Sequence, residues 1–305
     1  MRILTLFLDG IGLGDDNPEI NPFAAADTPT MLEFSNGRRW LADTGRQESE
    51  RAIFLPTDAR LGVTGRPQSG TGQASLLTGL NASQLIGRHY GPKPDAETRS
   101  LIAEHSTFRR LTMRGKSARL LTAYPPRLLS DFERGKTLRS SVQQAAFASG
   151  LPHFTLDDVI HRRALTAEWT TNSWRRYLKL DNLPNYPPRE AGRLLAKLAL
   201  QYDFSFHSHW LTDRIGHRGT LQRGIDILER FDAVLRGVLE KWDDADGLVI
   251  ITSDHGNMED LGTRRHTLND VPTVVIGERA AEFAEGYSSL TDFVPACDRM
   301  FFGQA

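Results

Sequence analysis

Three short segments of the sequence combine carboxylates with histidines. Asp213 and His217 are separated by four positions, Asp254 and His255 are adjacent, and His266 follows in a third segment. Carboxylate oxygen and imidazole nitrogen are ligands that suit zinc or manganese, and such a set can hold two ions side by side. An interval of four places both side chains on one face of a helix. These five residues therefore predict a metal centre, although each segment taken alone also resembles an ordinary turn.

A loop of small residues between positions 65 and 78 offers a nucleophile. It runs into an expected helix and carries Ser69 and Thr71. A hydroxyl at the start of a helix lies near exposed backbone N–H groups and the positive end of the helix dipole, which favour a bound phosphate. Serine is a weak nucleophile until a metal lowers its pKa. The pattern indicates phosphoryl transfer but does not choose between the two hydroxyls, and a Gly-rich turn without chemistry is the alternative.

Apolar runs that end on acids explain how such residues can meet. Residues 2–8 and 247–253 are typical of buried strands, and they are followed directly by Asp9 and Asp254. A third, alternating run at 202–210 leads into the first of the metal-type segments. The spacing of apolar residues on both sides of this run predicts helices that connect parallel strands. Ligands of open α/β sheets bind beyond the carboxyl ends of the strands, so we expect the acids to converge there.

Composition and charge exclude several classes of function. The 305 residues include 37 Lys and Arg against 38 Asp and Glu, so no global basic field indicates a nucleic-acid partner. Cys297 is the only cysteine, which excludes an internal disulfide and a zinc site made of thiolates. The first apolar run is too short for a membrane span or a signal peptide. We therefore expect a cytoplasmic globular enzyme without a membrane partner, whose oligomeric state the sequence leaves unknown.

The motifs together resemble those of a known group of metalloenzymes. The resemblance is to the alkaline phosphatase superfamily, and within it to the cofactor-independent phosphoglycerate mutases and the phosphopentomutases. It rests on residues 8–12 and 21–30, on the Ser69 loop and on the three metal-type segments. It implies an α/β fold with an alkaline-phosphatase-like core, in which a mainly parallel central sheet is flanked by helices, plus a small inserted cap.

The middle of the chain differs from its two flanks. Between about residues 96 and 186 the sequence is richer in Arg, Thr and Ser and lacks strands followed by acids. We expect a metal-binding catalytic core at 1–95 and 187–305, interrupted by an inserted cap at 96–186. Within the insertion, the segment from Trp169 to Tyr177 interleaves aromatic and basic residues. It is either a lid over a sugar or nucleotide or a helix that packs its tryptophans on the core.

The resemblance also implies roles for individual residues. The mutase nucleophile lies three residues before a Gly-His pair, and Ser69 lies three residues before Gly72-Gln73, which favours Ser69 over Thr71. Gln73 departs from the family pattern because it replaces the histidine. Two divalent metal ions are expected, with Mn²⁺ as the first choice and Zn²⁺ as the second. The resemblance assigns one ion to Asp9, Ser69, Asp254 and His255, and the other to Asp213, His217 and His266.

Further polar residues near the nucleophile loop are candidates for binding the substrate. They are Arg66, Thr71, Gln73, Arg88, His89 and Lys93. Arginine and lysine can hold phosphate oxygens, although solvated surface charge is the alternative explanation for these cations.

These patterns predict a two-metal phosphoryl-transfer enzyme, either a phosphatase or a mutase. Its partner would be a small-molecule phosphate monoester, processed through a phosphoserine at Ser69. One alternative is a phosphodiesterase that uses the same residues. Another is an inactive metal-binding module.

Overall fold

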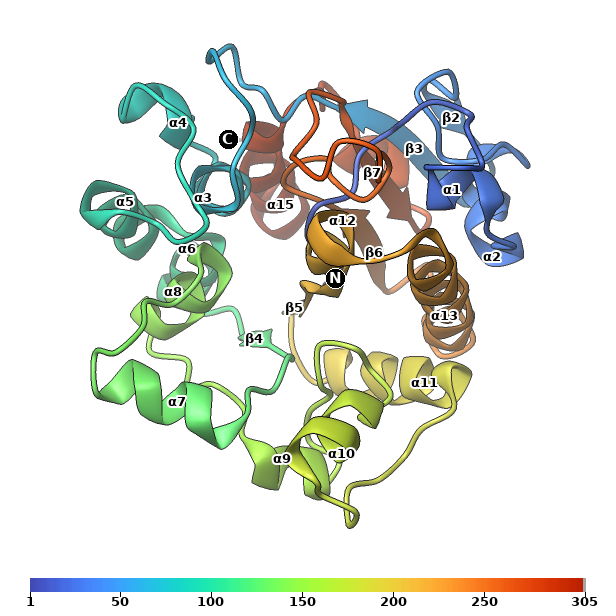
Figure 1. Cartoon of the computed structure of the whole chain (residues 1–305). Coiled ribbons are helices and arrows are strands. Elements are labelled where there is room, and N and C mark those ends of the chain that lie inside the picture. Colours follow the sequence, from blue (N-terminus) through green and yellow to red (C-terminus); the bar gives the residue numbers. More distant parts are fainter. Residues whose placement is uncertain (304–305) are drawn as a thin grey trace.

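One seven-stranded sheet organises the chain (Figure 1). The computed structural model describes residues 1–303 and orders the strands β2-β3-β7-β6-β1-β5-β4. Four neighbouring strands, β4, β5, β1 and β6, run parallel, whereas β7 is antiparallel to β6, and β3 is antiparallel to β7. The predicted α/β fold with a mainly parallel central sheet is confirmed. The strands are β1 (Arg2–Leu8), β2 (Gln47–Glu48), β3 (Ala52–Thr57), β4 (Ala118–Leu120), β5 (Phe204–His209), β6 (Gly247–Thr252) and β7 (Val271–Ile276).

Strand β1 lies at the centre of the parallel part, between β5 and β6. Leu4 and Leu6 belong to one apolar core, whereas Ile3 and Phe7 belong to a second. Successive side chains of a strand point to opposite faces, so a strand covered on both faces is apolar throughout. The continuous apolar run at the start of the sequence therefore predicted a buried strand correctly, and the same holds for β6.

Helices cover both faces of the sheet. One core contains residues of α11 and α13, and the other contains residues of α3, α5, α6, α8 and α15. The helices of the described residues, including the short 3-10 helices η1 and η2, are α1 (Pro22–Ala25), α2 (Pro29–Leu32), η1 (Glu33–Ser35), α3 (Ser69–Thr78), α4 (Ala82–Leu85), α5 (Ala96–His105), α6 (Thr107–Met113), α7 (Pro126–Glu133), α8 (Ser141–Ala148), α9 (Leu156–Ile160), α10 (Asn172–Leu178), α11 (Pro188–Ala199), α12 (Leu211–Arg218), α13 (Leu221–Leu239), α14 (Ala280–Phe283), η2 (Leu290–Asp292) and α15 (Phe293–Phe302).

The segment 96–186, expected as an inserted cap, is partly built into the core. Its strand β4 pairs in parallel with β5 at the edge of the sheet, and its helices α5 and α8 pack against α3. The later helices α7, α9 and α10 lie in the lower part of Figure 1, away from β2 and β3. The division into core and cap stays a prediction, with the correction that β4 belongs to the central sheet.

The structure places no membrane span in residues 1–303. No helix there combines the length and the hydropathy that a bilayer crossing needs.

Two glycines allow α11 and α13 to lie side by side (Figure 1). A Cβ on Gly192 would lie 2.0 Å from the Val234 carbonyl oxygen, and a Cβ on Gly237 would lie 1.9 Å from the Arg189 carbonyl oxygen. Both neighbours are helical backbone, which cannot move aside as a flexible side chain can. The helix pair that supports one face of β1 therefore depends on these two positions.

We expect Gly192→Ala to destabilise the fold because the added methyl group would collide with the backbone of α13. Overpacking of this kind costs about 1–3 kcal/mol. The measurement is the urea midpoint of unfolding, with the exposed Lys197→Ala on the same helix as the control. An unchanged midpoint in Gly192→Ala would contradict the close contact.

Candidate metal centre

The metal-type residues meet at one edge of the sheet. Asp9 follows β1 and Asp254 follows β6, and these neighbouring strands run parallel, so their carboxyl ends coincide. Helix α12 begins just after β5 and carries Asp213 and His217. Because β7 runs antiparallel to β6, the loop before β7 reaches the same edge and brings His266 there. The predicted convergence beyond the strand ends is therefore what the fold produces.

Asp213, His217 and His266 form the first group. The Nε2 atoms of the two histidines lie 3.1 Å apart, and each lies 3.4 Å from Asp213 Oδ1. The other ring nitrogens face backbone carbonyls, since His217 Nδ1 lies 3.2 Å from Arg264 O and His266 Nδ1 lies 2.7 Å from Pro67 O. If each Nδ1 donates to its carbonyl, both Nε2 lone pairs point at one another and at a carboxylate. Such an arrangement is stabilised by a cation between them.

Asp9, Asp254, His255 and Ser69 form the second group. Ser69 Oγ lies 2.9 Å from His255 Nε2. The same Nε2 lies 3.5 Å from Asp9 Oδ1 and 3.5 Å from Asp254 Oδ2. Asp9 Oδ1 is buried and accepts no hydrogen bond from any residue that the structure describes. Buried polar atoms are normally paired, so a free carboxylate oxygen here indicates a missing cation.

The pKa shifts of Asp9 and Asp213 reflect the burial of these acids and the charges close to them. Burial, followed by the charges of Asp254 and Asp213, raises the pKa of Asp9 well above its ordinary value. Burial would also raise the pKa of Asp213, but hydrogen bonding to His266 and the charge of His255 hold it well below its ordinary value. Divalent cations at this cluster would remove the repulsion that Asp9 experiences.

The two histidines nearest the acids differ in their pKa shifts. Burial lowers the pKa of His255 despite the nearby charge of Asp254. Burial acts in the same direction on His266, but its hydrogen bond to Asp213 raises the pKa above the ordinary value. A metal ligand must be a neutral imidazole, and the burial of His255 favours that form.

The donors fit two neighbouring divalent ions. Asp213, His217 and His266 offer ligand atoms within 4.8 Å of one another, and so do Asp9, Asp213 and His255. The oxygen and nitrogen donors are compatible with both Mn²⁺ and Zn²⁺. The assignment of each residue to one ion stays a prediction, but all seven predicted ligands lie in the two groups.

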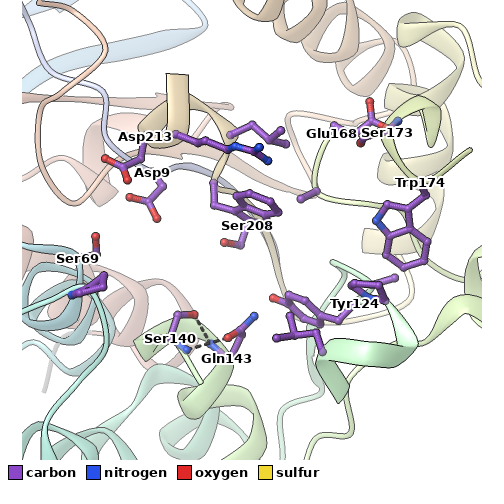
Figure 2. A pocket seen from close by; sticks show the side chains of 18 of the residues that line it. Asp9, Ser69, Tyr124, Ser140, Gln143, Glu168, Ser173, Trp174, Ser208 and Asp213 are labelled. Carbon is purple, nitrogen blue, oxygen red and sulfur yellow. Dashed lines mark hydrogen bonds between the residues drawn. The ribbon is translucent and has the colours of Figure 1, made fainter. Parts of the chain in front are cut away.

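Ser69 is the first residue of α3 and faces the metal-type residues (Figure 2). A Cβ on Gly72 would lie 2.8 Å from the Asp254 carbonyl oxygen, so only glycine lets this helix approach the end of β6 so closely. Thr71 is fully buried, and its Oγ1 accepts a hydrogen bond of 3.2 Å from Tyr90 N. The geometry thus favours Ser69 over Thr71 as nucleophile, and Thr71 holds the neighbouring loop instead of facing the substrate.

Gln73, a candidate for substrate binding, contacts the acids directly. Its Nε2 donates hydrogen bonds of 3.1 Å to Asp9 Oδ2 and 3.0 Å to Asp254 Oδ2. It bridges the two carboxylates and so fixes their orientation. These hydrogen bonds leave Asp9 Oδ1 and Asp254 Oδ1 to other partners.

Lys93 is the cationic candidate that the fold brings to the nucleophile. It lines the same cavity as Asp9 and Ser69. Burial lowers the pKa of Lys93, and the charge of Asp9 offsets part of this effect. Within residues 1–303 it forms no ion pair at salt-bridge distance. A half-buried ammonium group beside the acids is suited to bind a phosphate oxygen.

The other cationic candidates lie outside the cavity. Arg66 is exposed and donates a hydrogen bond to the His266 carbonyl oxygen, which steadies the loop before β7. Arg88 is exposed, and its guanidinium lies over the Tyr90 ring. The imidazole of His89 contacts Ser83 Oγ and Val63 O, at 3.1 and 3.2 Å. These three residues support the loops around the site, and none of them lines the cavity.

Sequence reasoning missed the residues that hold the ligands in place. Asn257 Nδ2 donates a 2.6 Å hydrogen bond to Asp213 Oδ1. The buried Glu259 accepts hydrogen bonds of 2.9 Å from Gly12 N and 2.7 Å from Asn257 N. Such supporting groups orient metal ligands. The only sequence signal was that both residues closely follow the Asp-His-Gly motif.

A cavity of about 1010 Å³ opens beside the two groups (Figure 2). Asp9, Ser69 and Asp213 lie at one end of it, and Tyr124 and Trp174 lie toward the other. Much of its wall is formed by 123–143 and 167–178, inside the segment that was expected to be a cap. That segment therefore contributes to the binding site whether or not it moves.

We expect Asp9→Asn to raise the Tm of metal-free protein at pH 8. A carboxyl whose pKa is higher in the folded state than in the unfolded state loses stability as the pH rises above its unfolded value, and asparagine removes that cost. The same change should lower the metal content from about two ions per chain to about one. Thermal unfolding in EDTA and elemental analysis measure the two effects.

The exposed Asp16→Asn is the matched control for this experiment. It should alter neither Tm nor metal content. A lower Tm for Asp9→Asn in EDTA would contradict the crowding of the acids, and an unchanged metal content would contradict the role of Asp9 as a ligand.

Comparisons with known proteins match part of the sequence and the whole fold. Residues 188–297 match the family described as the Metalloenzyme superfamily. The 2,3-bisphosphoglycerate-independent phosphoglycerate mutase of Methylobacillus flagellatus is 32% identical over 108 residues, which are 33% of this chain and 21% of that enzyme. The corresponding mutase of Thiobacillus denitrificans is 37% identical over 116 residues, 35% of this chain and 22% of that enzyme. The match thus spans about a fifth of the length of these relatives.

Solved structures resemble the whole fold. The PH0037 protein of Pyrococcus horikoshii has a TM-score of 0.60 at 14% identity and covers 100% of this chain and 98% of that one. Leishmania mexicana phosphoglycerate mutase has a TM-score of 0.51 at 13% identity, with coverage of 100% and 96%. A mutant of TAB5 alkaline phosphatase with bound Mg has a TM-score of 0.53 at 12% identity, with coverage of 98% and 96%. At such identities the likeness shows the fold alone.

The sequence match covers part of the chain, whereas the likeness of fold covers all of it. The matched segment contains the residues of the first metal group and the Asp-His pair of the second. Residues 188–297 thus match the Metalloenzyme superfamily, and the fold of the whole chain is similar to those of a phosphoglycerate mutase and an alkaline phosphatase.

Proposed function

We propose that the protein hydrolyses a phosphate monoester through a phosphoserine at Ser69. One observation carries this proposal. Ser69 Oγ lies 2.9 Å from His255 Nε2, at the start of α3 and beside the two groups of metal-type residues. A hydroxyl in this position can attack phosphorus, while the helix N-terminus offers N–H groups and positive potential to the phosphate.

In the first step, Ser69 Oγ forms a bond to phosphorus as the bond from phosphorus to the ester oxygen breaks. The divalent ions, when bound, would lower the pKa of the serine hydroxyl and offset the negative charge of the phosphate. Gln73 keeps the Asp9 and Asp254 carboxylates oriented, and Lys93 can bind a non-bridging phosphate oxygen. The departing alcohol takes up a proton, and the serine ester remains.

In the second step, water attacks phosphorus and releases inorganic phosphate, which regenerates Ser69. Once the alcohol has departed, the cavity of about 1010 Å³ has space for water beside the phosphoserine, which favours water as the acceptor. A mutase would instead have to hold a second alcohol in place of water. The relatives named as phosphoglycerate mutases make mutase activity the second candidate.

We propose Mn²⁺ as the resident ion and Zn²⁺ as the alternative. The oxygen-rich second group suits Mn²⁺, whereas the imidazoles suit either ion. A small-molecule phosphate ester as the partner and a cytoplasmic location complete the proposal. The single, buried cysteine is consistent with a reducing compartment.

Ser69→Ala should lower the turnover of an aryl phosphate monoester by at least about a thousandfold, because the reaction loses its nucleophile. Mass spectrometry of wild-type protein quenched with substrate should locate phosphate on Ser69. Thr71→Ser, which keeps the hydroxyl that bonds Tyr90 N, is the control and should stay active. Full activity of Ser69→Ala, or label on residue 71, would overturn the assignment.

Removal of metal with EDTA should abolish turnover, because the serine hydroxyl then keeps its high pKa. Adding Mn²⁺ back should restore more activity than adding Zn²⁺ at the same free concentration. Steady-state turnover, measured after dialysis and addition of each ion, tests whether Mn²⁺ restores more activity than Zn²⁺. Activity that survives complete removal of metal would contradict the proposed mechanism.

A further inference from the structure

We propose that the end of the cavity remote from Ser69 is a subsite for a planar aromatic ring, carried by the alcohol half of the phosphate ester. This inference rests on the proposed function, because it names the substrate class of the same site. Its starting point is the shape of the cavity. Asp9, Ser69 and Asp213 lie at one end, and Tyr124 and Trp174 lie across the cavity from them (Figure 2).

The size of the cavity argues for a large alcohol. Its volume of about 1010 Å³ matches the upper range of pockets that bind drug-sized ligands, roughly 300–1,000 Å³. A three-carbon phosphate ester would occupy only the end near Ser69. The remote end would then hold water against apolar walls, which is unfavourable.

The walls of the remote end are aromatic and aliphatic. Tyr124 is buried, Trp174 is partly buried against the core, and Leu128 and Pro125 of the neighbouring segment complete this side. Tyr124 and Trp174 can contact a ring by its face or its edge, and such aromatic pairs add to the gain from burial alone. Aliphatic Leu128 offers a flat apolar contact as well.

The rim of the cavity exposes three large apolar side chains. Tyr177 is 69% exposed, Trp210 is 44% exposed and Leu178 is 38% exposed, and all three line this cavity. Large exposed apolar side chains that gather around one opening are typical of ligand-binding sites. Here they surround the entrance to the site that contains the proposed nucleophile.

The distribution of cationic side chains around the cavity also favours an uncharged ring at the remote end. Lys93 lies with the acids near Ser69, and Arg214 and Arg218 are exposed on α12. Tyr124, Leu128 and Trp174 are uncharged. Glu168 is a charged side chain on the Trp174 side of the cavity, and its carboxylate accepts hydrogen bonds from Thr170 Oγ1 and Ser173 N. A small, highly charged alcohol half would find no cation beside these three side chains. A ring would gain contact with all of them.

Polar groups beside the aromatic wall can contact the edge of a ring. Ser140 and Gln143 lie close to Tyr124, and Ser208 lies between this wall and the acids (Figure 2). An aryl group needs none of these donors and acceptors, whereas a nucleobase would use them. An aryl ester and a nucleotide both carry a planar ring, and the experiment below distinguishes these two classes of substrate.

The test compares naphthylmethyl phosphate with glycerol phosphate on manganese-loaded protein. Both are phosphates of alkyl alcohols, so a difference in kcat/KM reports mainly on binding of the alcohol half. We expect naphthylmethyl phosphate to be preferred by at least about tenfold, as burial of a ring predicts. Adenosine monophosphate and decyl phosphate are the two further substrates. A preference for the nucleotide over naphthylmethyl phosphate identifies a nucleoside ring, and the reverse identifies an aryl ring.

Trp174→Ala and Leu128→Ala should each reduce the preference for naphthylmethyl phosphate over glycerol phosphate by at least about fivefold. Because Trp174 also packs against the core, Tyr177→Ala serves as a second variant at an exposed position. Leu85→Ala is the matched control, since Leu85 is 55% exposed and lies outside the cavity. It should leave the preference unchanged.

Calorimetric titration with naphthylmethanol, which carries no phosphate, reads the subsite independently of catalysis. Binding that weakens in Trp174→Ala supports the subsite even if no phosphate ester is turned over, in which case only the proposed function fails. Equal kcat/KM for naphthylmethyl and glycerol phosphates, without binding of naphthylmethanol, would overturn the subsite while leaving the function intact. A stronger preference for decyl phosphate would overturn the planar ring in favour of an alkyl chain.

Discussion

Repulsion among buried carboxylates is the constraint on which the rest of this structure depends. Asp9, Asp213 and Asp254 lie at one edge of the sheet, and the first of them carries an unpaired buried oxygen. A folded protein tolerates such a cluster of negative charges only if positive charges or hydrogen bonds compensate for them. Divalent cations would do so here, and the surrounding hydrogen bonds from Gln73 and Asn257 hold the acids in the orientation that makes this possible.

The sheet positions the metal-type residues and Ser69, whereas another part of the chain lines most of the cavity. The acids and Ser69 stand at strand ends and at the start of α3, where the backbone is fixed by a buried core on each face. The cavity walls come largely from a different part of the chain, between 123 and 178. Rigid elements therefore position the reacting groups, whereas loops and short helices decide what fits beside them.

The sequence predicted the features that are local and missed those that depend on distant contacts. The apolar runs that end at Asp9 and Asp254 predict a strand in each case. They also predict the edge of the sheet at which the metal-type acid lies. Residues 118–124 could be read as a strand, but the place of β4 in the central sheet was missed because its pairing with β5 joins residues that are far apart along the chain. Gln73 was predicted as a departure from a family pattern and as a candidate for binding the substrate. Its hydrogen bonds to the acids were missed because they join residues that are far apart along the chain. The segment from Trp169 to Tyr177 was predicted either as a lid or as a helix that packs its tryptophans on the core. In the structure Trp169 is buried in the core, whereas Trp174 and Tyr177 line the cavity.

The central place of β1 has a consequence for how the protein is made. Its two neighbours in the sheet, β5 and β6, begin at residues 204 and 247, so β1 can pair only after these much later segments have been synthesised. Such long-range pairing slows folding and exposes an apolar strand during synthesis. The metal-type residues span positions 9 to 266, and a complete binding site therefore marks a chain that has finished folding.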